Sequence, residues 1–333
     1  MSQIQTVSTG VNAMPLEFPG LGISVEVNRV AFTVFGHSIF WYGIIAGLAF
    51  AVATTFYLRR GAAFGLNPDR VIDAVIGAVV CGVIGARIYY VAFRWEAYRY
   101  NLASIINLRE GGLAFYGGVI GGIVGALLVA RWRGIRRLPL LDLLASGLLI
   151  GLSIGRWGNF VNIEAFGSNT TAPWGMISPV TTNFLYAQQE TLAALGVSVD
   201  PHLPVHPTFF YEFLWGVLGF LLISLYIKRR KFDGEITLIF FGWYGLGRAV
   251  IEGLRVDSLT FGGFRVSQVL AVVFATVSII MLATAHVKKN PRYYKLYTDI
   301  VGLDSPPAPV KGRGVVEDEG GESKDENDPG GDG

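Results

Sequence analysis

Seven stretches of about 20 mostly apolar residues dominate the sequence, and they restrict the chain to a fold built from membrane-spanning helices. The chain of 333 residues is 52% hydrophobic and only 16% charged, whereas soluble domains carry about 25% charged residues. We therefore predict an all-α polytopic membrane protein. Its seven spans, numbered one to seven, are expected at residues 38–58, 71–93, 112–131, 139–162, 208–227, 236–254 and 264–285.

The charge of the connecting loops alternates along the chain, and this predicts the orientation of the spans. Arginine and lysine are concentrated in the first, third and fifth loops and after span seven, as in "RWRGIRR" at 131–137 and "KRRK" at 228–231. The fourth loop, about 163–207, contains neither residue type. Because positively charged loops stay in the cytoplasm, we place the N-terminus outside and the C-terminus in the cytoplasm.

Composition separates the membrane domain from three other parts of the chain. We expect an extracytoplasmic N-terminal arm at 1–37 and a seven-helix membrane domain at 38–295, with a small extracytoplasmic head inserted at 163–207. The acidic cytoplasmic tail at 303–333 is rich in Pro and Gly, so we expect it to be disordered. Cys81 is the single cysteine, which excludes an intramolecular disulfide and a cysteine-rich metal site. We expect neither a metal ion nor a cofactor.

Most polar and ionisable side chains inside the spans fall in the outer half of the membrane once this orientation is applied. An ionisable residue within a span costs about 2.5–3.5 kcal/mol on insertion scales, so it persists where it pairs or lines a cavity. Asp73 and Asp142 lie near the cytoplasmic interface instead, and we expect structural roles for both. The outer group comprises Tyr42, Arg87, Tyr116, Arg156, Asn159, His206, Tyr211, Glu212, Tyr244, Arg248, Glu252 and Arg255.

Span six carries its polar side chains along one stripe. Tyr244, Arg248 and Glu252 are spaced by four residues, and Arg255 follows three residues later, which places them on one face of a helix. A self-contained Arg248–Glu252 ion pair would explain two of them. It would not explain Arg156 and the other charges at a similar depth. We interpret the group as a site for an anionic ligand, because the planar arginine fork binds phosphate bidentately.

The residues by themselves leave three kinds of function open. The sequence contains no nucleotide-binding loop, no metal triad and no nucleophilic serine beside a base, since Ser153 in "GLSIG" lies inside a helical stretch. A lipid-phosphate enzyme, a transporter of an anionic lipid or organic anion, and a lipid-binding scaffold all remain. The outward bias of the charges and the lack of a visible repeat argue against the transporter.

Several motifs resemble one family of bacterial membrane enzymes. The stretch "GRWGNFVNIEAFG" at 155–167 is similar to the signature of the prolipoprotein diacylglyceryl transferases. The resemblance covers about residues 15 to 295, and its motifs occur in the right order. They include "FWYG" at 40–43, "GARIYYV" at 85–91, "GGLAFYGG" at 111–118, "HPTFFYE" at 206–212 and "YGLGRAVIEGLR" at 244–255.

The resemblance implies a reaction and its partners. Phosphatidylglycerol would donate its diacylglyceryl group to the lipobox cysteine thiol of a prolipoprotein, forming a thioether and releasing glycerol phosphate. This is the first step of bacterial lipoprotein maturation, on the outer face of the plasma (inner) membrane. Members have seven spans with the N-terminus outside. The implied partners are phosphatidylglycerol, the prolipoprotein and membrane lipids, and not nucleic acid.

The resemblance also implies roles for individual residues. Arg156 matches the family's phosphatidylglycerol contact, and a cation there would stabilise the charge that develops on the leaving phosphate. The catalytic candidates are Arg156, Asn159, Glu164, Tyr244, Arg248 and Glu252. The substrate-binding candidates are Arg156, Tyr42, Arg87, Tyr116 and His206.

The sequence departs from part of the family at the expected base. Many members have a histidine in the motif "GG…F-x-GG", where this chain has Tyr116. The attacking thiol must lose a proton, because the thiolate is the nucleophile. An unperturbed tyrosine hydroxyl, with a pKa of about 10, is a poor base at neutral pH. Either Tyr116 only orients substrate or another group takes the proton, with Glu252, Glu164 and His206 as candidates.

Overall fold

The computed structural model describes residues 13–107, 111–256, 260–261, 264–289 and 295–298. Among these residues are seven helices of 18 or more residues. Each of them begins and ends within three residues of the limits of one predicted span. They are α1 (Trp41–Arg60), α2 (Pro68–Phe93), α4 (Phe115–Trp132), α5 (Arg137–Asn162), α7 (Thr208–Tyr226), α8 (Glu235–Leu254) and α9 (Val266–Lys288).

Five of these helices, α1, α2, α5, α7 and α9, are long and apolar enough to cross a membrane. The chain is therefore a mostly helical, polytopic membrane protein. Helix α4 is apolar but shorter. Helix α8 is not among the five, because Arg248, Glu252 and its other polar residues lower its mean hydropathy.

The N-terminal arm departs from the expectation of an all-α chain, because two antiparallel hairpins precede α1. Strand β1 (Ala13–Phe18) pairs with β2 (Ile23–Asn28), in the register Ala13↔Asn28, and β3 (Val30–Val34) pairs with β4 (His37–Phe40). Strands of four to six residues were missed because they carry no long hydrophobic signal. Tertiary contacts hold the first hairpin: Leu16 is buried, and Glu17 exchanges backbone hydrogen bonds with Ile177 of the head.

The remaining elements are short, apart from the head helix α6 (Pro179–Ala194). Ser178 is the N-cap of α6 and forms a reciprocal capping box with Thr181. The short elements are η1 (Pro19–Leu21), η2 (Gly61–Phe64), α3 (Trp95–Tyr98), η3 (Leu102–Ile106), η5 (Ile227–Arg229), β5 (Thr260–Phe261) and β6 (Phe264–Arg265).

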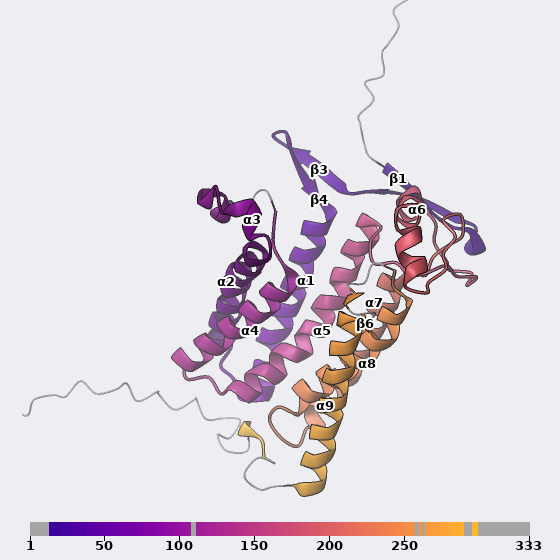
Figure 1. The fold of residues 1–333 in the computed structure, drawn as a ribbon. Helices are drawn as coiled ribbons and strands as arrows, with labels where there is room; N and C mark the ends of the chain where they lie inside the picture. Colours follow the sequence, from indigo (N-terminus) through magenta and orange to yellow (C-terminus); the bar gives the residue numbers. More distant parts are fainter. Residues whose placement is uncertain (1–12, 108–110, 257–259, 262–263, 290–294, 299–333) are drawn as a thin grey trace, which may run out of the picture.

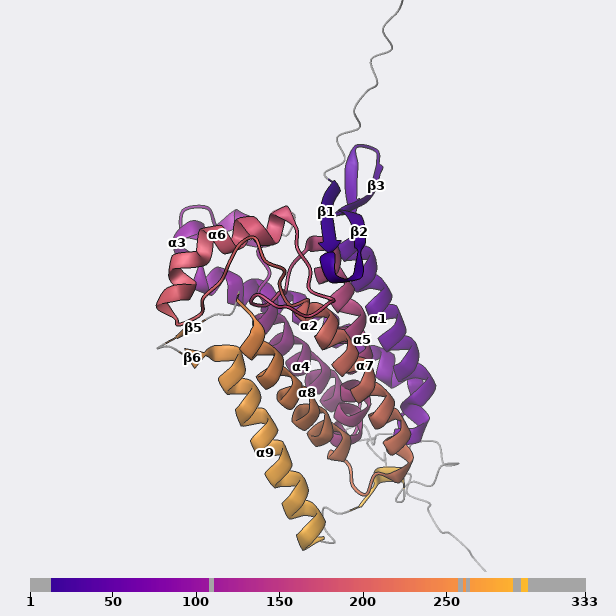
Figure 2. The ribbon, with the colours of Figure 1, turned by 90° about the vertical axis from the view of Figure 1, so that its right-hand side faces the viewer.

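The bundle places the predicted outer and inner segments at opposite ends. In Figures 1 and 2 the β-hairpins, α3 and α6 lie at one end, and the lower end of α9 lies at the other. The basic segments meet at that other end, where the Arg136 guanidinium lies 4.8 Å from the Tyr297 ring and Asp233 N–H donates to the Lys295 carbonyl. The predicted tail at 303–333 lies outside the described residues.

Small residues allow α2 and α4 to pack closely. A Cβ on Gly121 would overlap the carbonyl of Cys81, and one on Gly117 would overlap the carbonyl of Gly85. Helices approach this closely only where glycine removes the side chain from the contact. Cys81 contributes its backbone and its small side chain to this interface.

Asp142 and Asp73 have structural partners at the end opposite the head. The Asp142 carboxylate accepts the backbone N–H groups of Gly234 (2.7 Å) and Thr237 (2.8 Å) and the Thr237 hydroxyl (2.7 Å). It thereby caps the N-terminus of α8 from α5, where Gly234 offers no side chain of its own. Asp73 forms an ion pair with Arg133 Nε at 2.6 Å.

Two apolar cores leave a polar layer between them. The first joins α1, α2, α4, α5, α7 and α8 at the end opposite the head, with Leu143, Ile223 and Ile236 among its buried members. The second joins the arm, the head and the helix ends next to the head. Buried members of the second core include Leu16, Ile163, Phe166, Leu185, Val205 and Phe209. The segments of α5, α7 and α8 that carry the predicted site lie between the two cores.

Candidate functional site

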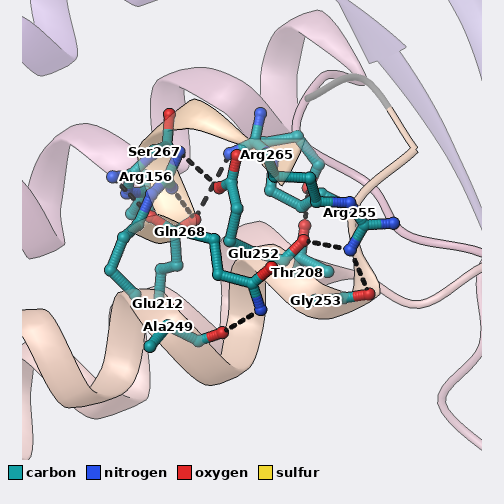
Figure 3. Close-up of polar contacts among 12 residues, drawn as sticks. Arg156, Thr208, Glu212, Ala249, Glu252, Gly253, Arg255, Arg265, Ser267 and Gln268 are labelled. Carbon is teal, nitrogen blue, oxygen red and sulfur yellow. Dashed lines mark hydrogen bonds and ion pairs between the residues drawn. The ribbon is translucent and has the colours of Figure 1, made fainter. Parts of the chain in front are cut away.

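Glu212 on α7 is the centre of an ion-pair cluster that joins three segments of the chain (Figure 3). Its carboxylate pairs with Arg156 of α5, with Arg248 Nη1 of α8 at 2.6 Å and with Arg255 Nη1 at 3.3 Å. The Glu212 side chain is only 7% exposed. Burial of this kind is tolerated because each charge has a partner of the opposite sign.

Helical spacing brings the second carboxylate into the same cluster. Arg248 Nη2 lies 2.7 Å from a carboxylate oxygen of Glu252, one turn further along α8. The ion pair within one helix is therefore real, but Arg248 uses its other nitrogen to bind Glu212. The planar guanidinium can satisfy both carboxylates at once because its donors point in different directions.

The cluster lines a narrow pocket between α5, α7 and α8. Tyr244 contributes to the wall, with its ring stacked on Phe240 at a centroid distance of 5.8 Å. Arg156, Tyr244 and Arg248 thus line the same pocket. The remaining lining residues are Leu149, Leu152, Ser153, Glu212, Trp215, Gly216, Gly247 and Ile251.

Positive charge is in excess at this pocket. Arg265, at the start of α9, adds a fourth guanidinium and donates to the backbone carbonyls of Glu252 and Gly253. Gln268 donates to the Ala249 carbonyl at 2.8 Å and fastens the same end of α8 (Figure 3). Among the described residues of this cluster, four arginines against two carboxylates leave a formal surplus of two positive charges, which favours an anionic ligand.

The loop after α5 is held in an unusual conformation beside the cluster. Ile163 and Ala165 both have φ of 54°, a region that non-glycine residues adopt rarely. The Ala165 carbonyl is fixed by the Thr208 hydroxyl at 2.6 Å and the Phe209 N–H at 3.0 Å. Such strain persists only where the surrounding structure enforces it, and it is typical of functional sites.

Asn159 and Glu164 lie at the edge of the site rather than within the ion pairs. Asn159 is partly buried in the last turn of α5, and its carbonyl accepts the N–H of Glu164 at 2.9 Å. The Glu164 side chain is exposed. Neither side chain takes part in the ion pairs that the described residues form around Glu212.

The two predicted tyrosines occupy different places. Tyr42 is 49% exposed and lies against α5. A Cβ added to Gly158 of α5 would lie 2.7 Å from the ring of Tyr42. Tyr116, 43% exposed, lies at the start of α4, and its hydroxyl is 3.1 Å from the hydroxyl of Ser267 at the start of α9. The structure thus places Tyr42 beside α5 and Tyr116 beside α9.

Arg87 lies apart from the ion pairs around Glu212 and contacts the loop between α2 and α4. It is 6% exposed, and all of its guanidinium nitrogens donate to backbone carbonyls of the segment between α2 and α4. These carbonyls belong to Ser104, Ile105, Asn107, Gly111 and Gly112. With its donors used in this way, Arg87 holds this loop. Its contact with substrate stays a prediction.

His206 lies in the head, just before α7. Its Nδ1 is 3.0 Å from the Tyr211 hydroxyl, which also accepts from Trp174 Nε1 at 2.7 Å. Desolvation by burial lowers the pKa of His206 below its usual value, so the neutral ring is favoured at neutral pH. His206 borders a second pocket in the head, together with Gly20 and Pro204.

Sequence reasoning did not include three residues that the structure brings to the site. Glu212 and Arg255 were placed at the correct depth but not among the candidates, and Arg265 was not considered. Glu212 could have been found from its position, because a carboxylate within a span needs a cationic partner and arginines occur at the same depth. The sequence contains no comparable signal for Arg265, because it does not indicate where the loop before Arg265 places this side chain.

Comparisons with known proteins agree with the geometry. The family model for prolipoprotein diacylglyceryl transferase matches residues 29–284. A phosphatidylglycerol–prolipoprotein diacylglyceryl transferase of Clostridioides difficile is 38% identical over 267 residues, which cover 79% of this chain and 97% of that protein. Proteins of the same name from Listeria innocua (39% over 271 residues; 80% and 93%) and Bacillus cereus (37% over 262 residues; 79% and 93%) are also similar.

Proposed function

The chain belongs to the prolipoprotein diacylglyceryl transferase family, and we propose that its Glu212-centred arginine cluster binds the phosphate of phosphatidylglycerol. The enzyme is a transferase that moves the diacylglyceryl group of phosphatidylglycerol to a prolipoprotein, the first step of lipoprotein lipidation. The transporter alternative has no support from the relatives. The observation that carries the phosphate proposal is the surplus of arginines around a narrow buried pocket.

The chemistry of the transfer fits this surplus. The lipobox cysteine thiol loses its proton to a base, and its sulfur forms a bond to the glycerol carbon of the donor. The carbon–oxygen bond to the phosphate breaks, and its electron pair stays on the phosphate oxygen. A phosphodiester with one negative charge thus becomes glycerol phosphate, a monoester with about −1.5 to −2 charges at neutral pH. Arg156 and Arg248 are placed to stabilise this added charge on the leaving group.

We assign the remaining residues by their places around the pocket. Tyr244 in its wall and Glu252 behind Arg248 orient the arginines. Asn159, Glu164 and Tyr42 surround the end of α5 and shape the rim through which the lipid and the peptide approach. Tyr116 and His206 lie further out and contact the substrates rather than the phosphate.

We also propose the membrane arrangement. All seven long helices span the membrane, with the arm at 1–37 and the head at 163–207 outside and the tail at 303–333 in the cytoplasm. The basic loops at the end opposite the head support this orientation, since such loops stay in the cytoplasm. The site then faces the outer leaflet of the bacterial inner membrane.

A transfer assay tests the proposed function. Purified enzyme in phosphatidylglycerol-containing micelles should label a lipobox peptide from phosphatidylglycerol carrying radiolabelled acyl chains, with release of glycerol phosphate. A peptide with serine in place of the lipobox cysteine is the matched control and should stay unlabelled, because its hydroxyl is a far weaker nucleophile than a thiolate. Absence of labelling with the cysteine peptide would refute the assignment.

Tyr116→Phe should retain most of the transfer activity. The Tyr116 hydroxyl contacts Ser267 and lies outside the Glu212 ion pairs, so we expect it to orient substrate rather than to accept the thiol proton. The expected change in kcat is less than about tenfold, below the 10²–10⁴-fold that general-base catalysis contributes. Tyr116→His, measured alongside, restores the residue found in many family members. A kcat loss of about 10²-fold or more in Tyr116→Phe would identify the hydroxyl as essential.

A further inference from the structure

We propose that Glu212 is an internal competitor for the phosphate-binding arginines: it pairs with Arg156 and Arg248, gives way to the phosphate of the lipid, and returns to the arginines to expel glycerol phosphate after each transfer. This inference rests on the proposed function, because it assumes that these arginines bind the phosphate. It assigns Glu212 a positioning role in product release, and no chemical step.

The contacts of Glu212 differ from those of the structural buried carboxylates. Asp142 is held by backbone N–H groups and a hydroxyl, and Glu235 by the Tyr226 hydroxyl (2.8 Å) and the Lys231 N–H. Among the described residues, Glu212 is held by guanidinium groups alone. No fixed backbone donor therefore has to be abandoned when this carboxylate moves, provided that another anion takes its place on the arginines.

The same guanidinium groups are the ones that a phosphate needs. Carboxylate and phosphate both bind to the arginine fork through paired oxygens, so they compete for the same donors. The side chains of Arg156 and Arg248 are 19% and 17% exposed, whereas that of Glu212 is 7% exposed. All three side chains line the pocket, and the two guanidinium groups are the more exposed of the three.

The charge change during the reaction explains why an internal competitor is useful. Glycerol phosphate carries more negative charge than the phosphodiester donor, about −1.5 to −2 against −1, so the arginines attract the product more strongly than the substrate. Without Glu212 the product would stay bound, and the enzyme would be slowed by its own product. Glu212 supplies the anion that replaces it.

Removal of the competing carboxylate tests the idea. Glu212→Gln should bind glycerol phosphate at least about tenfold more tightly than wild type, a change that corresponds to ~1.4 kcal/mol. Equilibrium binding of radiolabelled glycerol phosphate to the purified full-length enzyme measures this independently of activity. In the transfer assay, both kcat and the KM for phosphatidylglycerol should fall, because release becomes slow while binding becomes tighter. Unlabelled glycerol, which carries no phosphate, should not displace the radiolabelled glycerol phosphate.

Glu252→Gln is the matched control for the change in charge. It also removes one carboxylate from the cluster, but within the described part of the chain Glu252 forms an ion pair with Arg248 alone, so its gain in affinity should be smaller. Glu212→Asp keeps the charge and shortens the side chain, and it should give an affinity between wild type and Glu212→Gln. If Glu212→Gln does not fold, the affinity of Glu212→Asp for glycerol phosphate tests the competitor role instead.

The outcomes separate this inference from the proposed function. Equal or weaker glycerol phosphate binding in Glu212→Gln and Glu212→Asp, with an active wild type, would overturn the competitor role and leave the transferase in place. An equal gain in Glu212→Gln and Glu252→Gln would also overturn it, because charge alone would explain the result. A wild type that neither transfers lipid nor binds glycerol phosphate would instead remove the proposed function.

Discussion

Arg156→Ala should lower the rate of diacylglyceryl transfer by about 10²–10³-fold, the loss seen when one stabilising donor is removed from a buried transition-state site. Arg156 pairs with Glu212 and lines the pocket beside Arg248, and its side chain is 19% exposed. The cation would act on charge that develops as the bond to phosphate breaks. The effect should therefore appear mainly in kcat, measured as initial rates at saturating phosphatidylglycerol.

Arg156→Lys separates charge from geometry. Lysine keeps the positive charge but presents a single ammonium group in place of a planar fork, so we expect it to recover only part of the lost rate. Thermal unfolding in detergent should be measured for both variants, because loss of Arg156 also leaves Glu212 with fewer partners. A folded Arg156→Ala enzyme with nearly normal kcat would show that the phosphate binds elsewhere.

Arg87→Ala should have the largest effect on stability. The Arg87 guanidinium donates to five backbone carbonyls between α2 and α4 and lies 5.1 Å from the centre of the Tyr98 ring. Its removal leaves those carbonyls without their donor. A single hydrogen bond to a charged group contributes about 1.5–3 kcal/mol, so we expect the loss of stability to be at least this large. Thermal unfolding of the purified protein in detergent measures the change.

Arg87→Lys is the corresponding control. A lysine has three donors and no planar fork, so it cannot satisfy five carbonyls and should recover little of the stability. Activity should fall with stability, because Gly111 and Gly112 lead directly into α4, which carries Tyr116. A normal melting temperature for Arg87→Ala combined with lost phosphatidylglycerol binding would favour the substrate-binding role that the sequence suggested.

The helical part of the fold could be predicted because its signal is local. Each apolar stretch contains enough residues to define a helix without reference to the rest of the chain, and all seven long helices begin and end within three residues of the predicted limits. The arm could not be predicted in this way. Its strands are short, and β1 is stabilised by contacts with the head, about 160 residues away in sequence.

The site was predictable in its composition but not in its pairing. Arg156, Tyr244, Arg248 and Glu252 were expected together and line or adjoin one pocket. The helical spacing of four residues was sufficient to predict the Arg248–Glu252 pair. The pairing with Glu212 depends on how α5, α7 and α8 cross, and no spacing within one segment contains that information.

Arg87 and Arg156 show where the sequence stops being sufficient. Both are arginines in the last two turns of a span that runs toward the head, and both follow glycine-containing turns. The sequence by itself determined the helical membrane architecture, because the length of each apolar stretch is a local property. It also predicted at which end of the bundle these arginines lie, because loop charge can be counted without knowing the fold. The tertiary structure alone decided that Arg87 holds backbone carbonyls while Arg156 holds Glu212, since a guanidinium binds whichever acceptors the neighbouring helices bring within reach.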